Sequence, residues 1–152
     1  MVNPELSIYI RPFRTDEATL AAQAFAIRHE VFVEGQQVPP ELEYDGLDDE
    51  ATHYLATVNG RPAGAARWRS TARGIKLERF AVLEAYRGRG IGAAILQRML
   101  EETLPLKQWI YLHAQEPAVD FYLRHGFRRI GQPFEEAGII HFLMDLPVTA
   151  TR

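Results

Sequence analysis

The sequence predicts a single α/β (α+β) domain over residues 1–152, built on a mixed, mostly antiparallel sheet of about seven strands with helices on both faces. Its length fits one domain that buries about two thirds of its unfolded surface. Short apolar runs separated by turn residues fill the first half and predict a strand meander. The second half alternates predicted strands with predicted helices, which requires crossings over the sheet.

The first half begins with an alternating run, Ser7–Phe13, which predicts the opening strand. Thr15 or Asp16 is expected to cap a helix with four apolar residues on one face: Leu20, Ala24, Ile27 and Val31. Pro39-Pro40 ends regular structure, and the acidic segment that follows to Glu50 is expected to be a loop or a short helical turn.

The central elements are a hairpin and a third strand. The segments His53–Val58 and Gly64–Trp68 flank Asn59-Gly60-Arg61-Pro62, which is a hairpin signal. Leu77–Val82 is the third strand of this meander. The remaining predicted elements are a strand at Trp109–Ala114, a helix at Pro117–His125, and two closing strands near Phe127–Gly131 and Ile139–Leu146.

The stretch Leu77–Leu100 combines a strand, a turn with three glycines, and the start of a helix. Glycines let the backbone approach a ligand, and a helix N-terminus offers unpaired N–H groups and a partial positive charge. Three glycines at a helix start are costly unless such an approach is needed. The stretch therefore predicts an anion site, and a pyrophosphate is the expected anion.

The sequence of this turn is compatible with two classes of cofactor. Residues Gly88–Ala93 can be read as the dinucleotide fingerprint G-x-G-x-x-A, with Glu116 near the place of a ribose-binding acid. However, five residues (Leu83–Arg87) separate the strand from the first glycine, and only about sixty residues follow the turn. These two features oppose a doubly wound dinucleotide-binding fold.

The same turn, read as Arg87-x-x-Gly90-x-Gly92, resembles the acyl-CoA-binding motif Q/R-x-x-G-x-G/A of the GNAT acetyltransferases. A second stretch, PAVDFYLRHGF at Pro117–Phe127, resembles the segment A-x-x-F-Y-x-x-x-G-F of that family. The resemblance covers about Ile8 to Leu146, and within the family the chain looks like the ElaA-like subgroup. One departure is Gly35, where a second acid is expected beside Glu34.

The resemblance implies a GNAT fold whose sheet is splayed where the cofactor binds, with acetyl-CoA as cosubstrate. It places the pantetheine arm against the backbone of the strand that ends at Val82, and the pyrophosphate on the glycine turn. The residues expected to bind CoA are Phe80, Ala81, Val82, Arg87, Gly88, Arg89, Gly90, Ile91, Gly92 and Ala93.

Two side chains are predicted to be catalytic. By the resemblance, Tyr122 stabilises the leaving thiolate; the alternative is a core aromatic beside Phe121. Glu78 is placed by strand alternation on the same side as Phe80 and Val82, where desolvation would raise its pKa and suit it as a base. A cross-strand ion pair with a neighbouring arginine is an equal alternative for Glu78.

Composition excludes several other chemistries. The chain has no cysteine, and its five histidines show no metal-ligand spacing, so neither thiolate catalysis nor a metal site is expected. A net charge of −3 argues against nucleic acid, and the lack of a long apolar run argues against a membrane. We therefore expect a cytoplasmic protein, as a monomer or a homodimer. Without a serine or cysteine nucleophile, acetyl transfer should be direct, in a ternary complex.

Charge is unevenly distributed along the chain. From Val31 to Thr52 there are seven acids and no basic residue, whereas Arg61 to Arg89 is strongly basic. An acidic rim formed by residues such as Asp45, Asp48 and Asp49 would attract a cationic amine, although a merely solvated loop is an equal alternative. His141 and His53 are weak candidates for the same acceptor pocket.

The sequence thus predicts an acetyl-CoA-dependent N-acetyltransferase that acts on a primary amine of a small molecule. A non-catalytic acyl-CoA-binding domain of the same fold is one alternative, and a dinucleotide-binding oxidoreductase is the other.

Overall fold

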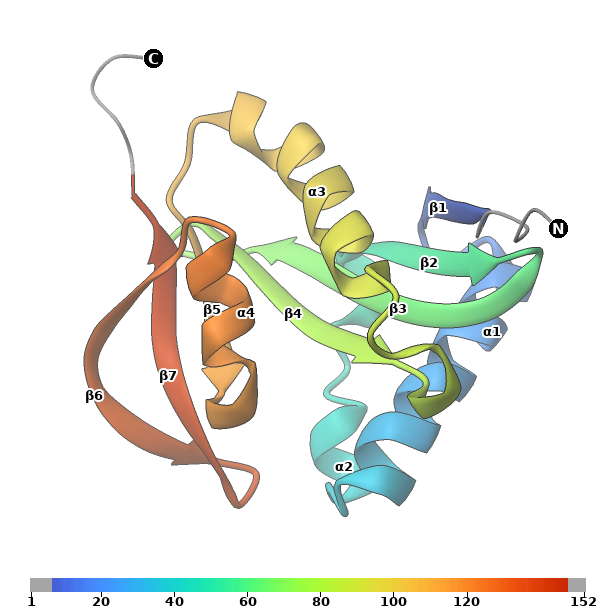
Figure 1. Cartoon of the computed structure of the whole chain (residues 1–152), viewed down its shortest axis with the longest axis horizontal. Coiled ribbons are helices and arrows are strands. Elements are labelled where there is room, and N and C mark those ends of the chain that lie inside the picture. Colours follow the sequence, from blue (N-terminus) through green and yellow to red (C-terminus); the bar gives the residue numbers. More distant parts are fainter. Residues whose placement is uncertain (1–6, 148–152) are drawn as a thin grey trace, which may run out of the picture.

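The computed structural model describes residues 7–147 of the chain (Figure 1). Seven strands form one sheet in the order β1-β2-β3-β4-β5-β7-β6. The only parallel pair in this sheet is β4 with β5; every other neighbouring pair is antiparallel. The strands are β1 (Ile8–Phe13), β2 (Thr52–Val58), β3 (Arg61–Ser70), β4 (Ile75–Val82), β5 (Ile110–Gln115), β6 (Arg128–Glu136) and β7 (Ile139–Leu146).

This arrangement confirms the predicted mixed sheet and rules out the doubly wound alternative. A dinucleotide-binding fold needs a mostly parallel sheet. Strands β1 to β4 instead form an antiparallel meander, whose β2–β3 hairpin turns at Asn59-Gly60. Both turn residues have positive φ, 51° for Asn59 and 84° for Gly60, as a two-residue hairpin turn requires.

The two long helices cover opposite faces of the meander. Helix α1 (Ala18–Arg28) packs on β2, β3 and β4 and continues as a π-helix over His29–Gly35. Helix α3 (Ile91–Thr103) packs on the other face, against β1 to β4. Two apolar clusters result, one that includes Ile27 under α1 and one that includes Ile95 under α3.

The start of α1 differs from the prediction. Thr15 or Asp16 was expected to cap this helix, but its N-cap is Glu17, which makes no side-chain capping bond. The Thr15 hydroxyl instead donates to Asp49 Oδ1 at 2.6 Å. That bond connects the residues before α1 to the short 3₁₀ turn Asp48–Glu50. The Thr15 hydroxyl is therefore not available as a cap.

Strands β4 and β5 diverge, which positions the site. Their paired residues run only from Ile75↔Ile110 to Leu77↔Leu112. Beyond that point β4 continues to Val82 and β5 to Gln115 without pairing, so the two strand edges face each other across a wedge (Figure 1). The sheet is therefore splayed, as the family resemblance implied.

The remaining elements build the second wall of this wedge. Helix α4 (Val119–Arg124) follows β5 through a 3₁₀ turn (Glu116–Ala118), and the β6–β7 hairpin continues the sheet beyond β5. On the opposite wall, the short helix α2 (Pro40–Glu43) lies after the π-helix, in the acidic segment expected to hold a loop or a helical turn. Figure 1 shows α2 and the β6–β7 turn on either side of the diverging strands.

Candidate active site

Two cavities lie along the wedge. The cleft cavity, of about 390 Å³, opens between β4 and β5 and is lined by residues that include Phe80 and Tyr122. The turn cavity, of about 440 Å³, lies beside the glycine turn and is lined by residues that include Val82 and Phe121. Strand β4 contributes Phe80 to the first cavity and Val82 to the second. Helix α4 likewise contributes Tyr122 to the first and Phe121 to the second, so the two cavities are adjacent along the wedge.

The turn cavity is built by the glycine turn and the start of α3. Gly88 and Gly90 adopt positive φ angles of 78° and 79°, and Gly90 is the N-cap of the helix. A helix leaves its first backbone N–H groups without intrahelical partners. The turn therefore presents N–H groups at Ile91, Gly92 and Ala93 toward the cavity that these residues line. This geometry suits a pyrophosphate, because the helix dipole adds positive charge there.

The two arginines of the turn differ in their contacts. The Arg87 side chain folds back, and its Nε donates to the Val82 backbone oxygen at 2.9 Å. Arg89 lies over the Tyr86 ring, with 5.8 Å between its Cζ and the ring centroid. Arg87 thus occupies a strand acceptor that the family resemblance assigned to the pantetheine arm. Because Arg87 is exposed in this structure, its rotation would free that acceptor at little cost.

Tyr122 lies on the α4 side of the wedge, with 6% of its surface exposed. Its ring packs edge-on against Phe80, Phe121 and Phe127, at centroid distances of 5.8, 5.0 and 5.8 Å. Burial raises the pKa of the phenol, so the hydroxyl stays protonated. It is therefore a hydrogen-bond donor on the wall of the cleft cavity.

Glu78 occupies a different environment from the one predicted. Its carboxylate contacts Arg67 at 2.6 Å, Arg69 at 2.8 Å and Lys76 at 3.3 Å. Burial acts to raise the pKa of Glu78, but the Arg69 hydrogen bond and the charges of Arg67 and Lys76 outweigh it, so the pKa is lowered. The expectation of a raised pKa is therefore wrong, and the cross-strand ion-pair alternative is confirmed.

A β-bulge explains why strand alternation failed at this position. Arg79 has a φ of +61°, and the β3–β4 register shifts between Ala65 and Arg67. One extra residue in a bulge moves the side chains before it to the other face. Glu78 therefore pairs with Arg67 on the α1 side of the sheet, whereas Phe80 and Val82 pack against the α3-side cluster.

The acidic segment does not form a free rim. Glu43 is buried against Arg28 at 2.9 Å. Asp48 bridges Arg28 and Arg67 at 2.7 Å each. Asp45 contacts Arg67 at 2.7 Å, and Asp49 accepts a hydrogen bond from Thr15. The three acids predicted to form the rim, Asp45, Asp48 and Asp49, are thus engaged with the protein's own groups. They do not support the inference of a cationic acceptor.

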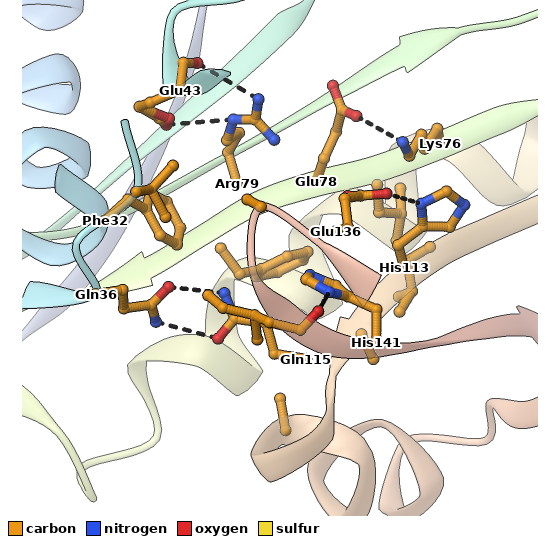
Figure 2. A pocket seen from close by; sticks show the side chains of 18 of the residues that line it. Phe32, Gln36, Glu43, Lys76, Glu78, Arg79, His113, Gln115, Glu136 and His141 are labelled. Carbon is orange, nitrogen blue, oxygen red and sulfur yellow. Dashed lines mark hydrogen bonds and ion pairs between the residues drawn. The ribbon is translucent and has the colours of Figure 1, made fainter. Parts of the chain in front are cut away.

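Several polar residues of the cleft cavity were not singled out from the sequence (Figure 2). Gln36 and Gln115 form a reciprocal amide pair across the wedge, at 3.1 and 2.8 Å. His113 Nδ1 lies 3.0 Å from Glu136 Oε2. No local motif marks these residues, because they meet only when the end of the π-helix, β5 and β6 fold around the wedge.

The two candidate histidines separate in the structure. His141 lines the cleft cavity, on β7. His53 packs between Phe13 and Phe25 in the core, with its Nε2 2.8 Å from the Asp48 backbone oxygen. Among residues 7–147, no cluster of histidine, cysteine and acidic residues could hold a metal ion. None of the helices described here is long and apolar enough to cross a membrane.

The fold and the two cavities define an acyl-CoA-dependent transferase scaffold, and comparison with known proteins assigns the family. The family model described as "Acetyltransferase (GNAT) domain" matches residues 15–148. The chain therefore belongs to the GNAT acetyltransferase family. The uncharacterized N-acetyltransferase YjcF of Bacillus subtilis is 39% identical over 123 residues, which cover 80% of this chain and 88% of that protein.

Solved structures agree with this assignment. The crystal structure of Escherichia coli ElaA superposes with a TM-score of 0.81 at 26% identity, over 93% of this chain and 100% of that one. The resemblance to the ElaA-like subgroup is thus confirmed. An aminoglycoside 6′-N-acetyltransferase complexed with coenzyme A has a TM-score of 0.73 at 14% identity, over 93% of this chain and 98% of that one, and shows the shared fold.

Proposed function

We propose that this protein transfers the acetyl group of acetyl-CoA directly to a primary amine of a small molecule, within a ternary complex. The observation that carries the proposal is the adjacency of the two cavities along β4 and α4. A turn suited to an anion at one end and a cleft cavity lined by polar and apolar side chains at the other leave room for a donor and an acceptor at once. The unpaired edge of β4 between them suits the amides of a pantetheine arm.

In this proposal the residues of the two cavities have separate roles. The glycine turn holds the pyrophosphate with backbone N–H groups, and Arg87 and Arg89 add exposed positive charge. The backbone of Phe80, Ala81 and Val82 binds the arm. Tyr122 donates a hydrogen bond to the sulfur as negative charge develops there, an interaction that strengthens in the transition state.

Glu78 has a positioning role in this proposal, not that of the base. Its three cationic partners keep it ionised, and it lies on the α1 side of the sheet with Arg67. Through Arg69 and Lys76, both of which line the cleft cavity, it fixes two cationic side chains of the acceptor side. The charge of the acceptor is left open, because Asp45, Asp48 and Asp49 already contact the protein's own groups.

Thiol release across a panel of alkylamines, amino acids, amino sugars and polyamines tests this function. We expect free CoA to appear only when acetyl-CoA and a suitable amine are both present. Binding of acetyl-CoA without turnover on any amine would favour the alternative, a GNAT domain that acts as an acyl-CoA-binding module. Thermal shift provides the control, since acetyl-CoA should raise the melting temperature and NAD(P)H should not.

A further inference from the structure

Acetyl transfer to an alkylamine needs a proton acceptor in the cleft cavity, and this inference rests on the function proposed above. An alkylammonium titrates near 10.4, so only about 0.04% of it is free base at pH 7. The lone pair of the nitrogen must be freed before it can attack the thioester. A basic group of the cleft cavity must therefore take that proton.

The four carboxylates of the cavity already contact basic side chains of the protein. They are Glu43, Asp45, Glu78 and Glu136. Glu43 contacts Arg28 and Arg79, and Glu78 contacts three cations. The hydrogen bond from His113 lowers the pKa of Glu136 to about 2. Burial opposes a similar shift in Asp45, but its bonds to Arg67 and to the Leu47 N–H lower that pKa to about 2 as well. Asp45, Glu78 and Glu136 are therefore weak bases in this setting. The Glu43 carboxylate is occupied by its two arginines.

His141 is held differently. It lies on β7, opposite Gln115 of β5 and Phe134 of β6, and only 6% of its surface is exposed. Its Nδ1 is 2.7 Å from the Ile139 backbone oxygen. A carbonyl oxygen can only accept, so Nδ1 carries the hydrogen and Nε2 carries the lone pair. Stacking on Phe134, at 5.9 Å and 25°, holds the ring in place.

The Nε2 atom of His141 is open to the cavity. It has no hydrogen-bond partner among residues 7–147. Among the side-chain nitrogen and oxygen atoms of the same range, only Nε of Arg79 is both buried from solvent and without a hydrogen-bond partner. Nε2 of His141 is therefore not such a buried atom. It is accessible to solvent, and the cleft cavity is the space that His141 lines. His113, the other imidazole of the cavity, instead uses Nδ1 to bind Glu136 (Figure 2).

We propose that Nε2 of His141 accepts a proton from the ammonium group of the acceptor. The freed nitrogen attacks the thioester carbonyl carbon, so that a C–N bond forms and the C–S bond breaks. The nitrogen loses two protons overall. The first passes to His141 and then to solvent, and the second ends on the departing sulfur. Until then, Tyr122 stabilises the negative charge on the sulfur.

The charges around His141 are compatible with this role. The titratable groups that line the cavity with it are, on the α2 side, Glu43 and Asp45; on β3 and β4, Arg69, Lys76, Glu78 and Arg79; and on β5, α4 and β6, His113, Tyr122 and Glu136. Glu136 is the anion whose charge interacts with His141, and it would stabilise the imidazolium. The cations Arg69, Lys76 and Arg79 disfavour the positive charge of the acceptor's ammonium group, and this assists loss of its proton.

His141→Asn tests the proposal, because its amide N–H can still donate to the Ile139 oxygen while nothing replaces Nε2. With the best alkylamine from the panel, we expect kcat/KM to fall about 100-fold or more. The wild-type decline of kcat/KM at low pH should disappear from the profile of the variant. His113→Asn is the matched control, and it should keep that decline.

A second acceptor substrate distinguishes a catalytic role of His141 from a structural one. An arylamine or hydrazide that is already neutral at pH 7 needs no prior deprotonation, so H141N should reduce its rate far less. Added imidazole should restore part of the alkylamine rate. Equal losses with both acceptors, or an unchanged pH profile, would overturn the assignment. If calorimetry gives an unchanged affinity for CoA, the H141N variant is folded. If H141N does not bind CoA, H141Q is tested in its place. Failure of the wild type to acetylate any amine would instead overturn the proposed function itself, and this inference with it.

Discussion

At the scale of single residues, Tyr122 combines the two properties that a thiolate-stabilising donor needs. Its ring is fixed by aromatic neighbours on three sides, and its hydroxyl is kept protonated by burial. A phenol of raised pKa is a poor proton donor toward a thiol that titrates near 8.5. We therefore expect it to act through a hydrogen bond rather than through full proton transfer.

Tyr122→Phe removes only the hydroxyl and leaves the ring packing. Acetyl transfer should slow by roughly one to three orders of magnitude, as for loss of one charge-stabilising donor. The melting temperature and the calorimetric affinity for CoA should barely change. A variant that turns over at the wild-type rate would show that Tyr122 is a core aromatic.

A second residue-scale prediction concerns Glu43, whose side chain is 1% exposed and contacts Arg28 and Arg79. Glu43→Gln leaves both arginines without this counter-charge. The free energy of unfolding should fall by about 3 kcal/mol, as for a broken buried ion pair. Urea unfolding measures this loss. Glu41→Gln, on the exposed side of α2, is the matched control and should change stability by less than about 0.5 kcal/mol. Equal effects of the two substitutions would contradict the ion-pair account.

At the scale of elements, the proposed function assigns the donor side of the site to the β4–turn–α3 unit. Strand β4 provides an unpaired edge, and helix α3 provides its N-terminus beside that edge. Gly90 is the N-cap of this helix, and a Cβ added there would meet no atom within 4 Å. The glycine is therefore required by its φ of 79° rather than by crowding inside the protein. In the proposed function, the open space beside it is where the pyrophosphate binds.

Gly90→Glu places a side chain and a negative charge where the pyrophosphate is expected. It should weaken CoA binding by several kcal/mol. Gly90→Gln has the same size and the same backbone strain, about 1–2 kcal/mol, without the charge. Calorimetry should rank the CoA affinities as wild type, then Gln, then Glu. Wild-type affinity in a folded Glu variant would show that the phosphates bind elsewhere.

At the scale of the whole molecule, the sheet and helices could be predicted because their signals are local. The hairpin at Asn59-Gly60 and the glycine turn before α3 are examples. The role of Glu78 could not be predicted, because a bulge at Arg79 moves it to the other face of the sheet. The pairing of Asp45 and Asp48 with buried arginines also depends on contacts distant in sequence, as does the exposure of Nε2 of His141 to the cavity.

The buried charge network makes a prediction for the stability of the whole molecule. Burial lowers the pKa of His53 below its ordinary value of 6.5, so the unfolded chain binds the proton more tightly. The free energy of unfolding should therefore decline as the pH falls below about 6.5. A second decline should follow from about pH 4 to pH 2. Burial opposes the pKa shifts of Asp45 and Asp48, but arginine contacts leave both pKa values lowered, that of Asp45 to about 2.

Urea unfolding at a series of pH values checks both steps. His53→Gln should remove the decline between pH 6.5 and 5 and leave the acid step in place. A wild-type stability that stays flat from pH 7 to pH 5 would show that His53 is not held neutral in the folded state.

The central claim is that an acetyl group passes from acetyl-CoA to an amine without first binding to the protein. Trideuterated acetyl-CoA, followed by mass spectrometry of the amines, the free CoA and the intact protein, tests it most directly. We predict one labelled acetyl group on the amine for each CoA released, with the protein unlabelled throughout. Release of CoA without a labelled amine, or a labelled protein that forms and decays during turnover, would contradict the account.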